Sequence, residues 1–153
     1  NGGFEQSSSG WSNQTQCGDI TYALDTSQRH SGAASARLLC SALGPPEVEE
    51  KFKTRAWGRW YQPAIPVQPG RKYRMRLWIR TSKDFSGKIH AWATGDKEVG
   101  TRTAVSLNTE GLWKEVTMEG ITPEANEITL YLNLMEGTGT VWLDDVELTE
   151  AEP

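Results

Sequence analysis

Alternation of apolar and polar residues with a period of two recurs along this chain, and it constrains the fold more than any other feature. In the longest example, residues 72–81, Met75, Leu77 and Ile79 fall on one side. Arginines and Trp78 fall on the other side. Successive side chains of a β-strand point to opposite faces of the sheet. The alternation therefore predicts strands with one face in a core and one face toward solvent.

Similar stretches recur between glycine and proline turn signals. Strands are expected at 35–41, 60–67, 72–81, 88–94, 113–118, 128–135 and 141–148. No stretch predicts a clear amphipathic helix, and the acidic residues 47–52 favour a solvated loop. The 15 Gly and 7 Pro suit many tight turns. We therefore predict an all-β fold, an antiparallel β-sandwich of the jelly-roll type with about eight to ten strands.

Acidic stretches lie near both ends of the chain. Residues 1–5 read Asn-Gly-Gly-Phe-Glu, and residues 141–148 read Val-Trp-Leu-Asp-Asp-Val-Glu-Leu. If the first and last strands pair, as in a jelly roll, carboxylates from both ends come together. Carboxylates and backbone carbonyls are the oxygen ligands that calcium prefers. These acidic stretches therefore predict a site where a hard cation such as calcium could link the two ends of the chain.

The length and net charge of the chain limit the kinds of partner that it can bind. A chain of 153 residues suits one domain that buries roughly two thirds of its unfolded surface. The net charge of −4 gives no basic footprint for nucleic acid. No apolar run approaches the ~20 residues of a membrane span. We expect no nucleic-acid or membrane partner, a module at residues 1–149, and the start of a linker at residues 150–153.

Cys17 and Cys40 are the two cysteines. A disulfide between them would close a loop of about 24 residues and contribute roughly 3 kcal/mol to stability. Such a bond would imply an extracellular protein, whereas the alternative is two buried thiols. With two cysteines and two histidines, a zinc site of the usual Cys/His kind is not expected.

Six short motifs carry a resemblance to a known group of families. They are Asn-Gly-Gly-Phe-Glu at 1–5, Gly-Trp at 10–11, His-Ser-Gly-Ala-Ala-Ser at 30–35, Pro-Gly-Arg-Lys-Tyr at 69–73, Gly-Leu-Trp at 111–113 and the acidic motif at 141–148. In this order, over essentially the whole chain, they resemble the jelly-roll carbohydrate-binding modules of families 4, 9, 16 and 22. The resemblance implies a non-catalytic, monomeric module within a secreted multidomain enzyme, which holds a glycoside hydrolase on its polysaccharide.

The same resemblance implies a structural calcium ion between the first and last strands. The matching ligands are the carboxylates of Glu5 and Asp144 and backbone carbonyls at Gly3 and near Ser31. Asp144 is preferred over Asp145 from its place in the motif. Such an ion would stabilise the fold by joining the chain ends and would not contact sugar. The alternative is that these acids are ordinary solvated residues at strand ends.

Aromatic rings are the candidate sugar contacts. A pyranose has a nearly apolar face that stacks on rings, while its hydroxyls need polar partners, and this chain has 7 Trp and 4 Tyr. Trp78 and Trp92 share outward parity on successive strands and are expected on one face. The full set of expected contacts is Trp57, Trp60, Trp78, Trp92 and Tyr131, with polar partners Arg76, Arg80, His90, Asn133 and Gln62. The alternative is that the rings only cover a sheet face.

Other classes of function are also compatible with these residues. A basic stripe at Lys72, Arg74, Arg76 and Arg80 would suit a uronate-bearing polysaccharide, or it is a solvated face balanced by Glu. An aromatic patch would also suit a protein-adhesion domain. Jelly rolls also host glycosidases, but the acids here fall in predicted loops, and nucleophile-elbow and metalloprotease motifs are absent. The favoured prediction is non-catalytic binding of a neutral β-linked glycan such as β-glucan, xylan or mannan.

Overall fold

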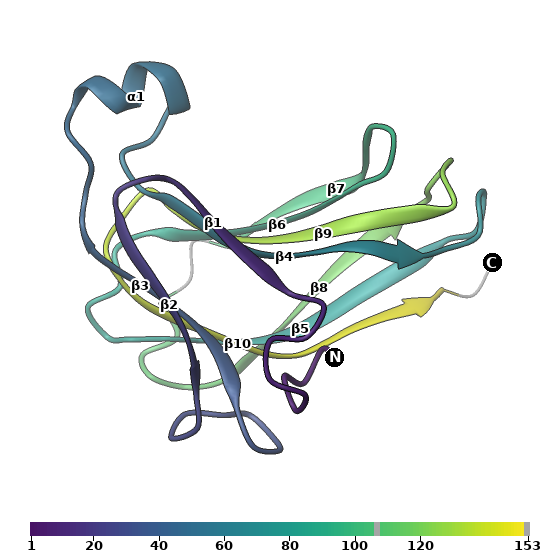
Figure 1. Ribbon diagram of the computed structural model, residues 1–153, viewed down its shortest axis with the longest axis horizontal. Helices are drawn as coiled ribbons and strands as arrows, with labels where there is room; N and C mark the ends of the chain where they lie inside the picture. The colour runs from purple at the N-terminus through teal and green to yellow at the C-terminus, as the bar shows by residue number, and fades with distance from the viewer. Residues whose placement is uncertain (106–107, 152–153) are drawn as a thin grey trace.

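The computed structural model of this chain describes residues 1–105 and 108–151, with side chains for all of them except residues 98–105. The described residues form ten strands and one short helix (Figure 1). In chain order they are β1 Ser12–Cys17, β2 Asp19–Asp25, β3 Ser35–Ala42, α1 Glu47–Phe52, β4 Trp57–Pro66, β5 Tyr73–Thr81, β6 Lys88–Thr94, β7 Glu98–Val105, β8 Lys114–Ile121, β9 Glu127–Met135 and β10 Gly139–Glu150.

The strands form two antiparallel sheets that face each other. Sheet A has the order β1-β4-β9-β6-β7, and sheet B has the order β2-β3-β10-β5-β8. In Figure 1 sheet A is the upper layer and sheet B the lower one. Successive strands of the chain often lie in different sheets, because β4 and β6 belong to sheet A while β5 belongs to sheet B. The predicted all-β, antiparallel sandwich is confirmed.

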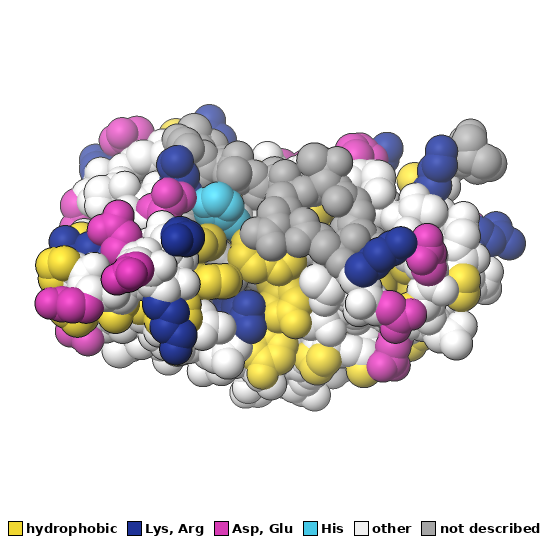
Figure 2. Space-filling model, turned by 90° about the horizontal axis from the view of Figure 1, so that it is seen from above, with side chains coloured by type: hydrophobic (Ala, Val, Ile, Leu, Met, Phe, Trp, Pro, Cys, Tyr) yellow, Lys and Arg dark blue, Asp and Glu magenta, His cyan; other side chains and the backbone are white. Residues whose placement is uncertain are grey.

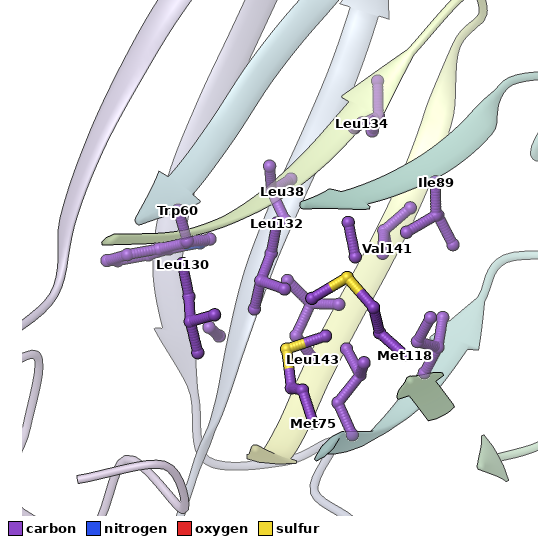
Figure 3. Packing of buried hydrophobic residues seen from close by; sticks show 14 of the residues in the cluster. Leu38, Trp60, Met75, Ile89, Met118, Leu130, Leu132, Leu134, Val141 and Leu143 are labelled. Atoms are coloured by element: carbon purple, nitrogen blue, oxygen red, sulfur yellow. The ribbon is translucent and has the colours of Figure 1, made fainter. Parts of the chain in front are cut away.

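Alternate side chains of the two sheets meet in the core. Figure 3 shows Leu130 and Leu132 of sheet A opposite Met75 and Leu143 of sheet B, and all four are at most 2% exposed. The burial pattern of β5 follows the predicted alternation, with Met75, Leu77 and Ile79 inward. Removing these apolar side chains from water stabilises the sandwich and leaves the alternate positions on its outer faces.

Helix α1 is a departure from the sequence prediction, which placed a loop at residues 47–52. Glu47, Glu49 and Glu50 lie in its first turn, where acidic side chains oppose the positive end of the helix dipole. Lys53 closes the helix in a left-handed conformation and donates its N–H to the Glu49 carbonyl. Within the described ranges, no helix has the length and apolar character needed to cross a membrane.

The first residues of the chain lie beside β10 without pairing with it as a strand. Residues 1–5 form turns, and β10 pairs with β3 and β5. Val146 N donates to the Gly2 carbonyl at 3.0 Å, and any Cβ at Gly2 would overlap Val146 O. The predicted pairing of first and last strands is therefore wrong, although the acidic motif does lie beside the first residues.

The predicted disulfide is not formed. Cys17 and Cys40 are both free and buried. Cys17 ends β1 in sheet A and its thiol approaches the Thr54 carbonyl at 3.5 Å, whereas Cys40 lies in β3 of sheet B and approaches the Ala42 carbonyl at 3.4 Å. Burial raises the pKa of both thiols, which keeps them protonated and unreactive.

Candidate functional site on the outer face of sheet A

Three aromatic residues from three neighbouring strands form a row on the outer face of sheet A. Tyr61 of β4 lies opposite Tyr131 of β9, and Trp92 of β6 lies opposite Tyr131 on its other side. Directly opposed residues on one face of a sheet bring their side chains into contact. The strand register therefore places Tyr61, Tyr131 and Trp92 side by side.

Ring contacts extend this row into a continuous aromatic face, which comprises Phe52, Trp57, Trp92, Tyr131 and Tyr61. Ring centroids are 5.8 Å apart for Tyr61 and Tyr131, and 6.1 Å apart for Tyr131 and Trp92. Trp57 then contacts Trp92 at 6.2 Å and Phe52 of α1 at 6.4 Å, both edge to face. Figure 2 shows hydrophobic side chains gathered in the middle of this side of the molecule.

The guanidinium of Arg59 lies among these rings. Its Cζ is 4.5 Å from the ring centroid of Tyr131, 5.7 Å from that of Tyr61 and 5.9 Å from that of Trp57. Its Nη2 donates to Oε1 of Gln14 on β1 at 2.6 Å. Arg59 and Tyr61 were not among the predicted contacts. They lie two and four residues after Trp57 and so share its face, and the period-two pattern would have found them had the strand been started at 57 instead of 60.

Polar side chains beneath the rings fix their orientation. Trp57 Nε1 donates to Asn133 Oδ1 at 2.8 Å, and Asn133 Nδ2 donates to the His90 carbonyl at 2.9 Å. Asn133 is 1% exposed, so its amide positions Trp57 and is not available to a ligand. The His90 ring approaches Glu136 at 3.2 Å, and Lys88 approaches the same carboxylate at 3.8 Å.

A hollow of about 200 Å³, lined mainly by polar and charged residues, adjoins the end of sheet A that carries Glu136. It shares Glu136 with the charged group around His90. Helix α1 and the chain after it supply much of its wall. Its lining residues are Leu43, Glu49, Lys53, Thr54, Arg55 and Glu136.

Several predicted contacts do lie on the outer face of sheet A. Trp57, Tyr131 and His90 are partly exposed there. Trp92 also lies on this face but is 5% exposed, so it supports its neighbours more than it offers a free ring. An alanine at Trp92 would therefore reduce stability, contrary to a purely ligand-binding role.

Trp60 and Gln62 do not belong to this face. Trp60 is 3% exposed and lies in the core, where its Nε1 donates to the Arg37 carbonyl at 3.2 Å. The prediction of Trp60 as a ligand contact is wrong. In β4, Trp57 lies on the outer face, and residue 60, three positions later, therefore points inward. Gln62 shares that inward parity, and its amide lies next to Gly10.

Trp78 lies on the opposite side of the sandwich from Trp92. The two tryptophans were expected on one face, but β5 belongs to sheet B and β6 to sheet A. The Trp78 ring is stacked on His30, with centroids 3.9 Å apart and planes 14° apart. Trp78 is thus separated from the aromatic face by the whole core.

The basic stripe lies on the same outer face of sheet B and is largely paired within the protein. Arg74 bonds Glu119 at 2.7 Å, and Arg76 bonds Glu147 at 2.8 Å. Arg80 donates to Gln28 and lies over the Trp142 ring at 5.4 Å. This pattern matches the alternative of a solvated face balanced by Glu, and it separates Arg76 and Arg80 from the aromatic face.

Asp144 is committed to the backbone of the loop that contains residues 30 and 31. One of its oxygens accepts from His30 N at 2.9 Å and from Ser31 N at 3.2 Å. The other accepts from Asp145 N at 2.8 Å, and the residue is 0% exposed. Burial raises the pKa of Asp144, while these amide bonds oppose the rise. Both oxygens of Asp144 therefore accept from backbone amides, and the residue holds this loop in place.

The carboxylates of Asp145 and Glu5 both lie near Gly3. A Cβ on Gly3 would lie 3.5 Å from Asp145 Oδ1 and 3.9 Å from Glu5 Oε1. Asp145 has a left-handed φ of 49° in the β10 bulge and accepts from Ser31 Oγ at 2.7 Å. The described residues contain no group of three His, Cys, Asp or Glu side chains arranged to hold a metal. Asp145 also contacts the His30 ring, with Nδ1 at 2.6 Å from its Oδ2, so an oxygen-liganded ion such as calcium would share this carboxylate with His30 and Ser31.

Comparisons with known proteins identify the fold. No family model and no curated protein matches the sequence. The carbohydrate-binding module TmCBM61, solved with β-1,4-galactotriose, matches with a TM-score of 0.69 and 19% identity over 99% of this chain and 96% of that one. The xylan-binding domain CBM22-1 from Xyn10C of Paenibacillus barcinonensis matches with a TM-score of 0.68 and 14% identity over 99% and 92%.

The chain has the fold of jelly-roll carbohydrate-binding modules. Modules of families 16 and 4 match as well. The enzymatically active domain of tailspike protein 4 from bacteriophage CBA120 also matches, with a TM-score of 0.69 and 15% identity over 99% of this chain and 21% of that one. At these identities the likeness concerns the fold alone. The resemblance drawn from the six sequence motifs is confirmed at that level.

Proposed function

We propose that this chain is a non-catalytic carbohydrate-binding module whose ligand lies on the aromatic face of sheet A. The observation that carries the proposal is the row of Tyr61, Tyr131 and Trp92, flanked by Trp57 and crossed by Arg59. The partly exposed rings of Trp57, Tyr61 and Tyr131, supported by the buried Trp92, offer apolar area to pyranose faces and lose little conformational entropy on binding. Guanidinium N–H groups beside them suit sugar oxygens.

The proposed ligand is a β-linked polysaccharide, of the β-glucan, xylan or mannan type. The names of two structural neighbours support this class, since one was solved with β-1,4-galactotriose and another is a xylan-binding domain. In this proposal the module is secreted as part of a larger chain and keeps a glycoside hydrolase on its substrate. Glycoside hydrolysis needs two carboxylates across the sugar, whereas rings and a guanidinium dominate this face, which supports binding without catalysis.

Affinity electrophoresis in gels that contain soluble β-glucan, xylan or mannan tests the proposal. The wild type should be retarded by at least one glycan, and free oligosaccharide should reverse the retardation. Tyr61→Ala should weaken binding about ten-fold, because it removes one ring of the exposed row. Trp78→Ala is the matched control on sheet B and should bind as the wild type does. Equal retardation of both variants, or turnover of the glycan, would contradict the proposal.

We also propose a structural calcium ion at the chain ends. Glu5 and Asp145 would supply carboxylates, and Gly3 and Ser31 would supply backbone carbonyls. The ion would link the first residues to β10 and so stabilise the folded state by mass action. Glu5 accepts from Ala33 N at 2.9 Å and lies where any Cβ on Gly32 would collide with it. This constraint on Glu5 supports a role in joining the chain end to that loop.

A further inference from the structure

Arg59 occupies the centre of the aromatic face in a specific orientation. Its guanidinium lies 4.5 Å over the ring of Tyr131, while Gln14 Oε1 accepts from its Nη2 at 2.6 Å. A guanidinium packed on a ring keeps N–H groups along its edge, where they can donate to a neighbouring ligand. Gln14 fixes the direction of one of these groups.

The charge of Arg59 is not balanced by a carboxylate among the described side chains. Arg37, Arg71, Arg74 and Arg76 do reach carboxylates, at 3.7, 2.9, 2.7 and 2.8 Å from Asp25, Glu150, Glu119 and Glu147. Arg80 on sheet B resembles Arg59, since it donates to the neutral amide of Gln28 and its Nε is buried without an acceptor among the described residues, but it lies away from the aromatic face. The partner of Arg59 is a neutral amide, and its Nε is buried without an acceptor in the described part of the chain. A cation in this state gains more from an anionic ligand than a paired one does.

An acid at one end of sheet A, Glu136, is already engaged by basic side chains. Glu136 is approached by His90 Nε2 at 3.2 Å and by Lys88 Nζ at 3.8 Å. The adjoining hollow is lined by Lys53 and Arg55 together with Glu49 and Glu136. The basic groups at this end of sheet A are thus accompanied by Glu49 and Glu136, whereas Arg59 among the rings has only a neutral partner among the described side chains.

We propose that Arg59 recognises a carboxylate of the glycan, so that the bound polysaccharide carries a uronic acid beside Tyr131. The inference rests on the proposed function, because it names the ligand class of the same site. Two parallel N–H···O bonds between a guanidinium and a carboxylate are shorter and stronger than bonds to a neutral hydroxyl. The rings hold the sugar, and Arg59 selects among sugars. The basic stripe of sheet B, which is paired to Glu119 and Glu147, takes no part.

A matched pair of ligands tests this selection. One is a xylo-oligosaccharide with a glucuronate branch, and the other is the same compound with its carboxyl group reduced to an alcohol. Calorimetry should show about ten-fold tighter binding of the acidic form, and added salt should weaken that form more. A β-linked polyuronate fragment tests a carboxylate on the backbone in place of a branch.

Variants at the same position separate charge from geometry. Arg59→Gln should abolish the preference for the acidic form, and Arg59→Lys should retain part of it, because Lys keeps the charge but loses the planar fork. Gln14→Ala should reduce the preference without removing it. Arg76→Gln, on sheet B, is the control and should leave the preference intact. Thermal melts of every variant verify that the fold is retained.

The outcomes distinguish the two proposals. Equal affinity for the acidic and reduced forms, unchanged by Arg59→Gln while Tyr61→Ala still weakens binding, would overturn the role of Arg59 and keep the carbohydrate-binding function. Absence of binding to every neutral and acidic glycan by the wild type would overturn both. A preference that survives in Arg59→Gln but is lost in Arg76→Gln would move carboxylate recognition to sheet B.

Discussion

Adjacent residues on β4, Trp60 and Tyr61, point to opposite sides of sheet A and should respond oppositely to alanine substitution. Trp60 is 3% exposed and packs against Phe4 and Tyr22, with ring centroids 6.3 Å and 5.8 Å away. Replacing a buried Trp by Ala costs about 3–5 kcal/mol, because the cavity does not fully collapse. For a domain of this size, that loss lowers the melting temperature by roughly 6–20 °C. Sugar affinity below the new melting temperature should stay near that of the wild type.

Tyr61→Ala should show the reverse pattern. Its ring lies on the outer face, 5.8 Å from the Tyr131 ring, and contributes to the surface on which a sugar would stack. Loss of this ring should weaken glycan binding by about 1.4 kcal/mol, which is ten-fold, while the melting temperature changes by only a few degrees. Differential scanning calorimetry and titration calorimetry on both variants measure the two quantities. If Trp60→Ala lost affinity without loss of stability, the assignment of faces on β4 would be refuted.

Two further predictions concern stability. Burial alone would raise the pKa of Asp25, but hydrogen bonds from Ser27, Trp142 and Gln28 N lower it from 3.8 to about 2. The free energy of unfolding should therefore fall by about 2 kcal/mol as the pH falls from about 4 to 2. Urea titrations of Asp25→Asn should show a smaller fall over that range. Removal of calcium by a chelator should lower the melting temperature and leave glycan binding intact well below it. A melting temperature that the chelator leaves unchanged would count against the proposed ion. So would a chelator effect on the Glu5→Gln/Asp145→Asn double variant that equals the effect on the wild type.

Much of the fold follows from the two-residue alternation in the sequence. Burial of Met75, Leu77 and Ile79 requires a second apolar layer, and the matching alternation in β9 supplies it. The same reasoning placed Tyr131 and His90 on an outer face. Parity within one strand was reliable wherever the strand was long and its apolar positions were uniform.

Sheet membership and strand starts were not available from the same pattern. Alternation tells which residues of a strand share a face, but it carries no information on which sheet the strand joins, so Trp78 and Trp92 were placed together wrongly. In β4 the apolar residues Trp57 and Trp60 differ in parity, and only the register with β9 shows which one is inward. Asp144 and Asp145 posed a similar problem, because the bulge in β10 that turns Asp145 outward depends on backbone geometry.

Each outer face carries an arginine that is held by a neutral amide, Arg59 on sheet A and Arg80 on sheet B, so the two faces differ mainly in how their aromatic rings and remaining charges are engaged. Sheet B also carries tryptophans and arginines, but Trp142 donates to Asp25 at 2.9 Å, Trp78 is covered by His30, and Arg74 and Arg76 are neutralised by Glu. A ligand on that face would have to break these contacts before gaining its own. On sheet A, Tyr61 and Tyr131 stay half-exposed and Arg59 has only a neutral partner among the described side chains, so a ligand there gains contacts at little internal cost.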